Sequence, residues 1–222
     1  FRAGAYVVLL ASALAALIAP MLGAFAPLQF AHDFVLFAYT LGLARLFLML
    51  SALDVGSAFE GMGAAREASF SAFSEPALFL LIGSLALATG QTSFAGLVGT
   101  VHASPIYPVL VVPALAVLFI LLQSEASRVP VDDPLTHLEL TMIHEVMVLD
   151  HSGPELAAMQ FAGALRLSTY AGLIAALLNP FSPLEQPVPA ILASLVLMAV
   201  VAVAVGCVES LTARLRMRRV PR

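Results

Sequence analysis

Residues Pro189–Val208 read PAILASLVLMAVVAVAVGCV, a run without a single charged side chain. A helix needs about 20 mainly apolar residues to cross the roughly 30 Å of hydrocarbon in a bilayer. Five further stretches meet this requirement wholly or in part: Tyr6–Pro27, Phe34–Leu53, Pro76–Thr89, Pro108–Gln123 and Leu156–Leu178. The sequence therefore predicts an all-α fold, a polytopic transmembrane helix bundle with about six spans.

The composition supports a membrane environment and excludes several classes of protein. Hydrophobic residues make up 61% of the chain and charged residues 11%, whereas a soluble domain is about 25% charged. Without lysine and with a net charge of -4, the chain lacks the basic face that a nucleic acid partner requires. Cys207 is the single cysteine, so this chain cannot build a disulfide or a cysteine-ligated iron–sulfur cluster by itself. Any redox centre must belong to a partner.

The arginines outside the spans fall on one side of the expected bundle. Arg2, Arg66, Arg128 and the arginine-rich tail 214–222 share this side, and the loops on the opposite side contain no arginine. Short loops that carry Lys and Arg stay in the cytoplasm. We therefore expect the arginine-bearing side to face the cytoplasm. The sequence shows no internal repeat or low-complexity linker, which favours one transmembrane domain over residues 1–222.

Ionisable side chains concentrate in two segments that are expected to be cytoplasmic loops, at about residues 54–75 and 124–155. Arg45 and Arg166 fall within or at the ends of spans, where a charge is costly unless it is paired or reaches water. We therefore expect acidic partners for both arginines. Paired polar groups inside a bundle commonly mark an ion or proton route.

A structural interpretation stands beside the functional one. Loop acids next to a membrane are often solvated helix ends, which is the favoured interpretation for Glu60, Glu155 and Glu185. Glu75 before Pro76 is also typical of a helix start. Arg45 and Arg166 would then only tie helices together. Glu125 favours a functional role, because it ends an apolar run and precedes Arg128 at a helical spacing.

Three histidines, His137, His144 and His151, recur every seventh residue. Seven residues of helix rise about 10.5 Å, whereas metal–nitrogen bonds are about 2 Å long, so one straight helix cannot bring two of them to one ion. Histidine can carry protons near neutral pH, and Asp133 stands at a contact spacing from His137. The pattern favours proton transfer over a metal site. The sequence also lacks a zinc-protease motif and a phosphate-binding glycine loop.

The two acidic segments resemble the membrane anchor subunit of energy-converting nickel–iron hydrogenases, the formate hydrogenlyase and hydrogenase-4 membrane subunits. The resemblance rests on Gly61–Glu67 with Glu75–Pro76, on Asp132–Glu145 with Asp150–Pro154, and on the closing Glu209–Arg216. That family is related to the quinone-site membrane subunit of respiratory complex I. The family's subunit extends further at both ends, so we expect this chain to be truncated at both ends.

The resemblance to the complex I subunit can be followed position by position. The complex I subunit has a Glu, an Arg three residues later and then Pro-Phe-Asp, and this chain matches them with Glu125, Arg128 and Pro130–Asp132. An Arg and a later Glu of that subunit are matched by Arg66 and Glu75. The chain also departs from that pattern. Three alternate acids are replaced by Leu135, His137 and Glu139, and a Glu-Tyr-Ser-Gly by Asp150–Gly153. These departures favour the hydrogenase branch.

The resemblance implies a subunit without its own redox centre in a bacterial or archaeal cytoplasmic (inner) membrane. It would dock peripheral hydrogenase-like and iron–sulfur subunits, which carry nickel–iron and iron–sulfur centres, and pass protons or sodium ions toward antiporter-like membrane subunits. No catalytic, cofactor-binding or metal-binding residue is expected in this chain. The residues expected to take part in proton transfer or coupling are Arg45, Arg66, Glu67, Glu75, Glu125, Arg128, Asp132, Asp133, His137, Glu139, Glu145, Asp150 and Arg166.

Three other functions fit parts of this pattern. A quinone-site subunit of complex I would be expected to keep the alternate acids. A stand-alone ion transporter usually shows paired repeats and helices broken at mid-membrane, and neither is evident here. A purely structural anchor would use its polar loops only to hold the peripheral arm.

Overall fold

The computed structural model describes residues 2–103, 107–129, 131–132, 142–182 and 185–211. All of its regular structure is helical in these ranges, so the predicted all-α fold is confirmed. The helices are α1 (Arg2–Ile18), α2 (Asp33–Val55), α3 (Ala58–Thr89), α4 (Phe94–Ala103), α5 (Tyr107–Glu125), α6 (His144–Met147), α7 (Gly153–Leu178) and α8 (Pro187–Leu211).

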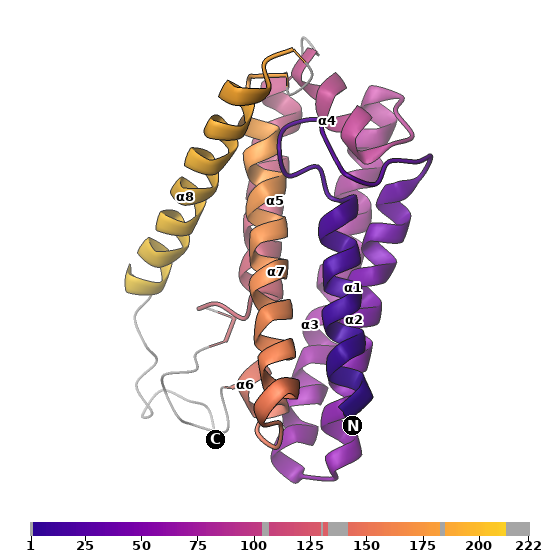
Figure 1. Ribbon diagram of the computed structural model, residues 1–222, viewed down its shortest axis with the longest axis vertical. Coiled ribbons are helices and arrows are strands. Elements are labelled where there is room, and N and C mark those ends of the chain that lie inside the picture. The colour runs from indigo at the N-terminus through magenta and orange to yellow at the C-terminus, as the bar shows by residue number, and fades with distance from the viewer. Residues whose placement is uncertain (1, 104–106, 130, 133–141, 183–184, 212–222) are drawn as a thin grey trace.

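Five of these helices, α2, α3, α5, α7 and α8, are long and apolar enough to cross a membrane. The remaining long apolar helix, α1, has 17 residues and lies along α2 and α7. The long helices run side by side, with α4 at one end of the bundle and α6 near the other end (Figure 1). Together they form a multi-pass membrane bundle.

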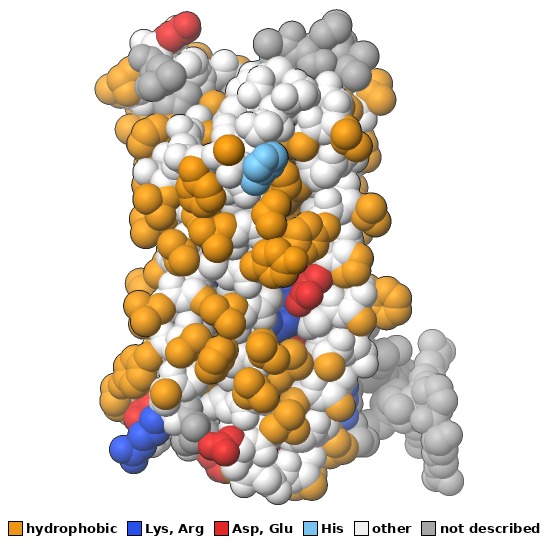
Figure 2. Space-filling model, turned by 90° about the vertical axis from the view of Figure 1, so that its right-hand side faces the viewer, with side chains coloured by type: hydrophobic (Ala, Val, Ile, Leu, Met, Phe, Trp, Pro, Cys, Tyr) orange, Lys and Arg blue, Asp and Glu red, His pale blue; other side chains and the backbone are white. Residues whose placement is uncertain are grey.

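The core lies between α2, α3, α5 and α7. Phe37, Leu122 and Tyr170 are among its fully buried side chains. By contrast, α8 packs mainly on α7 and exposes apolar side chains such as Val196 and Val203. Figure 2 shows patches of hydrophobic side chains along the whole height of one face of the molecule, as expected of a surface in contact with lipid.

Two predicted boundaries are wrong. In one case a helix ends before a proline, and in the other a helix continues through one. The first span was expected to run to Pro27 through a kink at Pro20, but α1 ends at Ile18. The backbone before a proline disfavours the α conformation, which explains the earlier end. Residues 58–75 were expected to form a loop, yet they are the first half of α3, and Pro76 lies inside this helix.

α3 is longer than a membrane span requires. Its 32 residues correspond to about 48 Å of helix, roughly 18 Å more than the hydrocarbon thickness. The 19 residues of α5 correspond to only about 28 Å. α3 and α7 are therefore longer than α5, and a bilayer that α5 just spans leaves part of their length outside the hydrocarbon.

Candidate functional site

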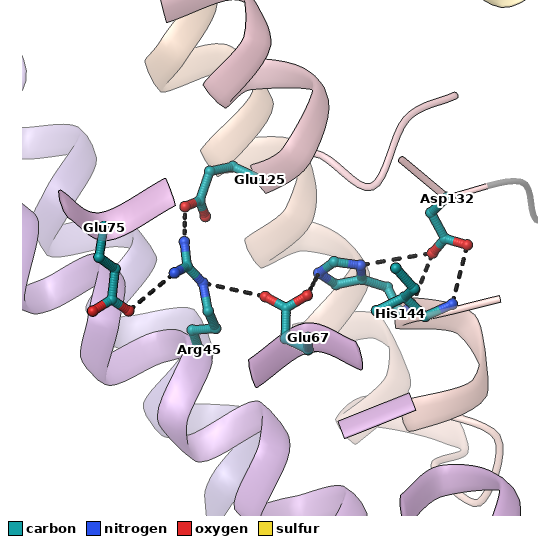
Figure 3. Close-up of polar contacts among 7 residues, drawn as sticks. Arg45, Glu67, Glu75, Glu125, Asp132 and His144 are labelled. Carbon is teal, nitrogen blue, oxygen red and sulfur yellow. Dashed lines mark hydrogen bonds and ion pairs between the residues drawn. The ribbon is translucent and has the colours of Figure 1, made fainter. Parts of the chain in front are cut away.

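Arg45, on α2, is the centre of a buried ionic network (Figure 3). Its side chain is 3% exposed and forms ion pairs with three carboxylates. Nε lies 3.2 Å from Oε1 of Glu67, and Nη1 donates a 3.0 Å hydrogen bond to Oε1 of Glu75. Nη2 is paired with Oε1 of Glu125. The predicted acidic partners of Arg45 are therefore present.

The three carboxylates come from two helices and differ in their exposure. Glu67 and Glu75 both stand on α3, and Glu125 is the last residue of α5. Glu67 and Glu125 are buried, whereas the side chain of Glu75 is 46% exposed. Three acids around one guanidinium give the network more proton-accepting groups than fixed positive charges.

His144 extends the network beyond Glu67. Its Nε2 lies 3.5 Å from Oε2 of Glu67, and its Nδ1 lies 3.6 Å from Oδ2 of Asp132 (Figure 3). Both separations suit an ion pair but are too long for a direct hydrogen bond. Neutral imidazole can accept a proton at one nitrogen and release one at the other. The arrangement can therefore link Asp132 to Glu67 through the His144 ring.

Asp132 is held by the backbone in front of α6. Its two carboxylate oxygens accept hydrogen bonds from the amides of Ile143 at 3.1 Å and His144 at 2.9 Å. Burial alone would raise the pKa of Asp132, but the imidazole and amide of His144 and the amide of Ile143 lower it below its ordinary value. Asp132 is thus an ionised anchor for His144.

The approach of α6 to α3 depends on Gly63. A Cβ atom at this position would lie 2.9 Å from the carbonyl oxygen of Ile143 and 3.0 Å from Cγ of Met147. One turn further along, Nη1 of Arg66 donates a 2.8 Å hydrogen bond to the carbonyl of Met142. The predicted site residue Arg66 therefore positions the segment that carries His144.

A second polar cluster lies at the same end of the bundle. Oγ of Ser51 is 3.0 Å from Nε2 of His151, and Oε1 of Glu60 accepts a 3.4 Å hydrogen bond from the amide of Asp150. Burial lowers the pKa of His151, although Glu155 and the carboxylate of Asp150 act in the opposite direction. His151 is therefore expected to be neutral at pH 7.

The second cluster corrects the interpretation of Glu60 as a solvated acid, because this residue is 1% exposed. Glu155 is partly buried and pairs with Arg2 at 3.6 Å, whereas Glu185 is exposed as expected. Glu60 is buried in the first turn of α3. The sequence was interpreted as a loop there, so this burial was not predicted.

Arg128 and Arg166 do not join the Arg45 network. Because α5 ends at Glu125 and Ser127 has a positive φ of 55°, Arg128 leaves the helix and pairs with Glu209 at 3.5 Å. Arg166, on α7, is 4% exposed and makes no ion pair with any residue that the structure describes. The carboxylate of Glu67 acts on Arg166 only at a distance, so the predicted direct acidic partner is not among these residues.

The remaining candidates are only partly accounted for. Glu145 and Asp150 are exposed at the polar end. Asp133, His137 and Glu139 lie outside the described residues. The expected histidine stripe is not one helix where it is described, because α6 ends at Met147, before His151. In the described ranges, no group of three or more His, Cys, Asp or Glu side chains is arranged to hold a metal ion.

Comparison with known proteins agrees with the resemblance of the two acidic segments. Hydrogenase-4 component C of Escherichia coli (strain K12) is 30% identical over 186 residues, which cover 84% of this chain and 58% of that protein. Formate hydrogenlyase subunit 4 of the same organism is 27% identical over 209 residues, or 91% of this chain and 67% of that protein. A family model described as NADH dehydrogenase matches residues 1–222. Because this match covers the whole chain, the protein belongs to the NADH dehydrogenase family.

Proposed function

We propose that this chain is the membrane subunit of a multisubunit hydrogenase-type oxidoreductase complex. In that complex it docks a peripheral redox arm and couples electron transfer to the translocation of protons or sodium ions. Family membership and the similarity to a hydrogenase component and a formate hydrogenlyase subunit support this proposal. The observation that carries it is the buried network from Asp132 through His144 and Glu67 to Arg45.

The proposed partners are those that the family resemblance implies, and the distribution of charge suggests where they dock. Peripheral hydrogenase-like and iron–sulfur subunits dock at the polar end, where α6 and the ends of α2 and α3 meet, on the cytoplasmic side. Nickel–iron and iron–sulfur centres reside in these subunits, and this chain contributes the proton-carrying side chains. Antiporter-like membrane subunits contact the apolar sides of the bundle.

The coupling step is a change in the pairing around His144. A negative charge that arrives in the docked arm favours protonation of His144, because an opposite charge nearby stabilises the imidazolium. Protonated His144 attracts Glu67, which competes with the pairing of Glu67 to Arg45. Arg45 then shifts its pairing toward Glu75 and Glu125, and the electrostatic signal reaches the level of the spans.

Glu75 is the carboxylate through which the network reaches the surface of the bundle. Its side chain is 46% exposed, and exposed apolar residues such as Tyr39, Leu43 and Phe79 lie on the same two helices. Figure 2 shows charged side chains that reach the surface between hydrophobic ones on a lateral face of the molecule. A carboxylate that faces hydrocarbon is costly, so we assign this position to the contact with a neighbouring membrane subunit.

The complex can be identified by gentle purification of the full-length protein from its native membrane and metal analysis of the subunits that co-purify. Nickel together with iron–sulfur centres would support the proposal. Iron–sulfur centres with flavin and quinone but without nickel would favour the complex I alternative. A preparation without any metal-bearing subunit would contradict both.

Proton coupling is tested separately with Glu67→Gln and with Glu155→Gln as the matched control. Both variants remove one carboxylate at the polar end, but Glu155 belongs to the surface pair with Arg2. We expect Glu67→Gln to lower ion translocation per assembled complex by about tenfold or more, in line with the loss of a proton-transfer group. In a purely structural anchor, Glu67→Gln would reduce assembly and leave translocation per complex unchanged.

A further inference from the structure

A pocket of about 390 Å³ adjoins the Arg45 network and shares His144 with it. Its walls come from α1, α2 and α7, and from the chain segments that follow α5 and surround α6. The apolar walls include Val8, Leu48, Met159 and Leu167, and the polar wall includes Arg166. The pocket thus combines an apolar lining with a buried cation.

Within the described part of the chain, the charge of Arg166 is balanced only at a distance, by the carboxylate of Glu67. The side chain is 4% exposed, its Nε lacks a hydrogen-bond partner there, and no ion pair is formed. The other ionisable groups at the pocket have partners or face outward: Arg128 pairs with Glu209, His144 lies between Glu67 and Asp132, and Glu145 is exposed. A guanidinium stays charged in proteins, and burying it without a counter-ion is costly. An anion in the pocket would remove this cost.

The pocket lies beside the end of α5, one of the candidate spans. Arg128 at its edge contacts Glu209 in the last described turns of α8, and α5 ends at Glu125, just before the pocket-lining residue Ala126. The span α5 therefore ends beside the pocket, while α7 continues past the pocket in both directions. Phosphate groups of a bilayer are found where spans leave the hydrocarbon.

A second, mainly apolar pocket adjoins the first. It has a volume of about 190 Å³ and shares Arg128 and Leu167 with the first. It follows Ala171, Val201 and Val205 between α7 and α8. A charged pocket joined to an apolar groove between two spans fits a ligand with an anionic head and a hydrocarbon tail.

We propose that the Arg166 pocket binds the phosphate of an anionic phospholipid, whose acyl chain lies in the groove between α7 and α8. A guanidinium binds phosphate through two parallel hydrogen bonds, which explains the use of arginine at this position. The proposal goes beyond the assignment of the protein to a redox complex and does not depend on proton transfer. The bound lipid is a structural ligand that fills the space between α1, α2 and α7.

Native mass spectrometry of the full-length protein with its partner subunits tests the proposal. The purified complex is titrated in detergent with phosphatidylglycerol or with phosphatidylcholine, and the lipid retained on this subunit is measured. Both lipids carry a phosphate, but in phosphatidylcholine the choline cation offsets its charge. Phosphatidylglycerol, which is a net anion, should therefore be retained about tenfold better than phosphatidylcholine. Equal retention of the two lipids by the wild type would overturn the proposal.

Two variants locate the site. Arg166→Gln removes the cation, and Gly163→Leu fills the pocket while Arg166 is kept, because a Cβ atom at Gly163 meets nothing within 4 Å. Each should lower retention of phosphatidylglycerol about tenfold. The matched controls are Arg2→Gln for the charge and Gly83→Leu for the added side chain, since Gly83 is a helical glycine with open space outside the pocket. Both controls should retain the lipid.

Wild-type retention of phosphatidylglycerol by both pocket variants would contradict the assignment to this site. Displacement of the lipid by millimolar inorganic phosphate would show that the site recognises the free anion and overturn the phospholipid as its ligand. A quinone that co-purifies in place of the lipid and is lost from Gly163→Leu would likewise overturn it.

Discussion

Arg45 shows how a single residue ties three helices together at the level of the spans. The guanidinium comes from α2 and the carboxylates of Glu67, Glu75 and Glu125 come from α3 and α5. Buried ion pairs add little net stability compared with an apolar core, but removing one partner leaves the others buried without a counter-ion. The network therefore constrains how α2, α3 and α5 rotate relative to one another.

Replacement of Arg45 by Gln should destabilise the protein strongly. The variant leaves Glu67 and Glu125 buried without a cation, which costs about 3–5 kcal/mol, and the half-exposed Glu75 adds little. The free energy of unfolding is measured in detergent by denaturant titration. Arg2→Gln, which breaks a surface ion pair, is the control and should change stability by less than about 1 kcal/mol.

A double variant makes the test of Arg45 specific. Arg45→Gln with Glu125→Gln should be more stable than Arg45→Gln alone, because the second substitution removes an unpaired buried charge. If Arg45→Gln unfolds at the same denaturant concentration as the wild type, the ion pairs described here do not stabilise the fold.

The lowered pKa of His151 predicts that the stability of the protein depends on pH. Burial lowers its pKa below the ordinary value of 6.5, so between the folded pKa and 6.5 the unfolded chain binds a proton that the folded chain does not. Stability therefore rises with pH in this window and decreases on acidification. We expect the melting temperature to decrease between pH 7.5 and pH 5.5, and to decrease less in His151→Gln. Equal slopes for the two proteins would contradict a buried neutral His151.

At the scale of the elements, apolar spans could be predicted and the polar half of α3 could not. The expected spans Pro108–Gln123, Leu156–Leu178 and Pro189–Val208 agree with α5, α7 and α8 to within three residues, because their hydrophobicity does not depend on which face is buried. The first half of α3 instead buries Glu60, Gly63, Ala64, Glu67, Ser71 and Ser74 at helical spacing. Its buried stripe is polar or small, so a search for apolar periodicity interprets it as a loop.

The candidate functional site, like the helices, could be predicted from the sequence only in part. The sequence predicted that Arg45 needs acidic partners and that residues near Glu75 and Glu125 carry the function. It could not predict that Glu125 turns to Arg45 while Arg128 turns to α8, because this depends on the unwinding of the chain at Ser127. His144 was not among the expected site residues, and its contacts with Glu67 and Asp132 depend on the close approach of α6 to α3.

The contact between α3 and α6 gives a prediction at the scale of elements. Gly63→Ala places a Cβ atom 2.9 Å from the carbonyl oxygen of Ile143, so α6 must move and stability should fall by about 1–3 kcal/mol. Gly61→Ala, two residues earlier on α3, meets nothing within 4 Å and should gain up to about 1 kcal/mol from helix propensity. Denaturant titration of both variants measures the difference. A similar stability change in the two variants would contradict the close contact at Gly63.

At the scale of the whole molecule, charge is segregated along the long axis of the bundle. Arg2, Arg66 and the Glu60–His151 cluster lie toward the end with α6, whereas α4 and the turn before it lie at the other end (Figure 1). Charged loops are translocated across a membrane with difficulty when they carry arginine. The segregation therefore predicts a single orientation of the protein in the membrane.

Cysteine accessibility measures this orientation. With Cys207 replaced by Ala, Asp54→Cys reports on the turn between α2 and α3, and Thr92→Cys reports on the turn before α4; both positions are exposed. In spheroplasts, a membrane-impermeant maleimide should label Thr92→Cys and leave Asp54→Cys unmodified, and inverted vesicles should show the reverse. The opposite pattern would place the Arg45 network on the outer side of the membrane, where a peripheral redox arm in the cytoplasm could not contact α6. Labelling of both sites in spheroplasts would instead show that the bundle does not separate the two ends, because only a spanning bundle protects one of them.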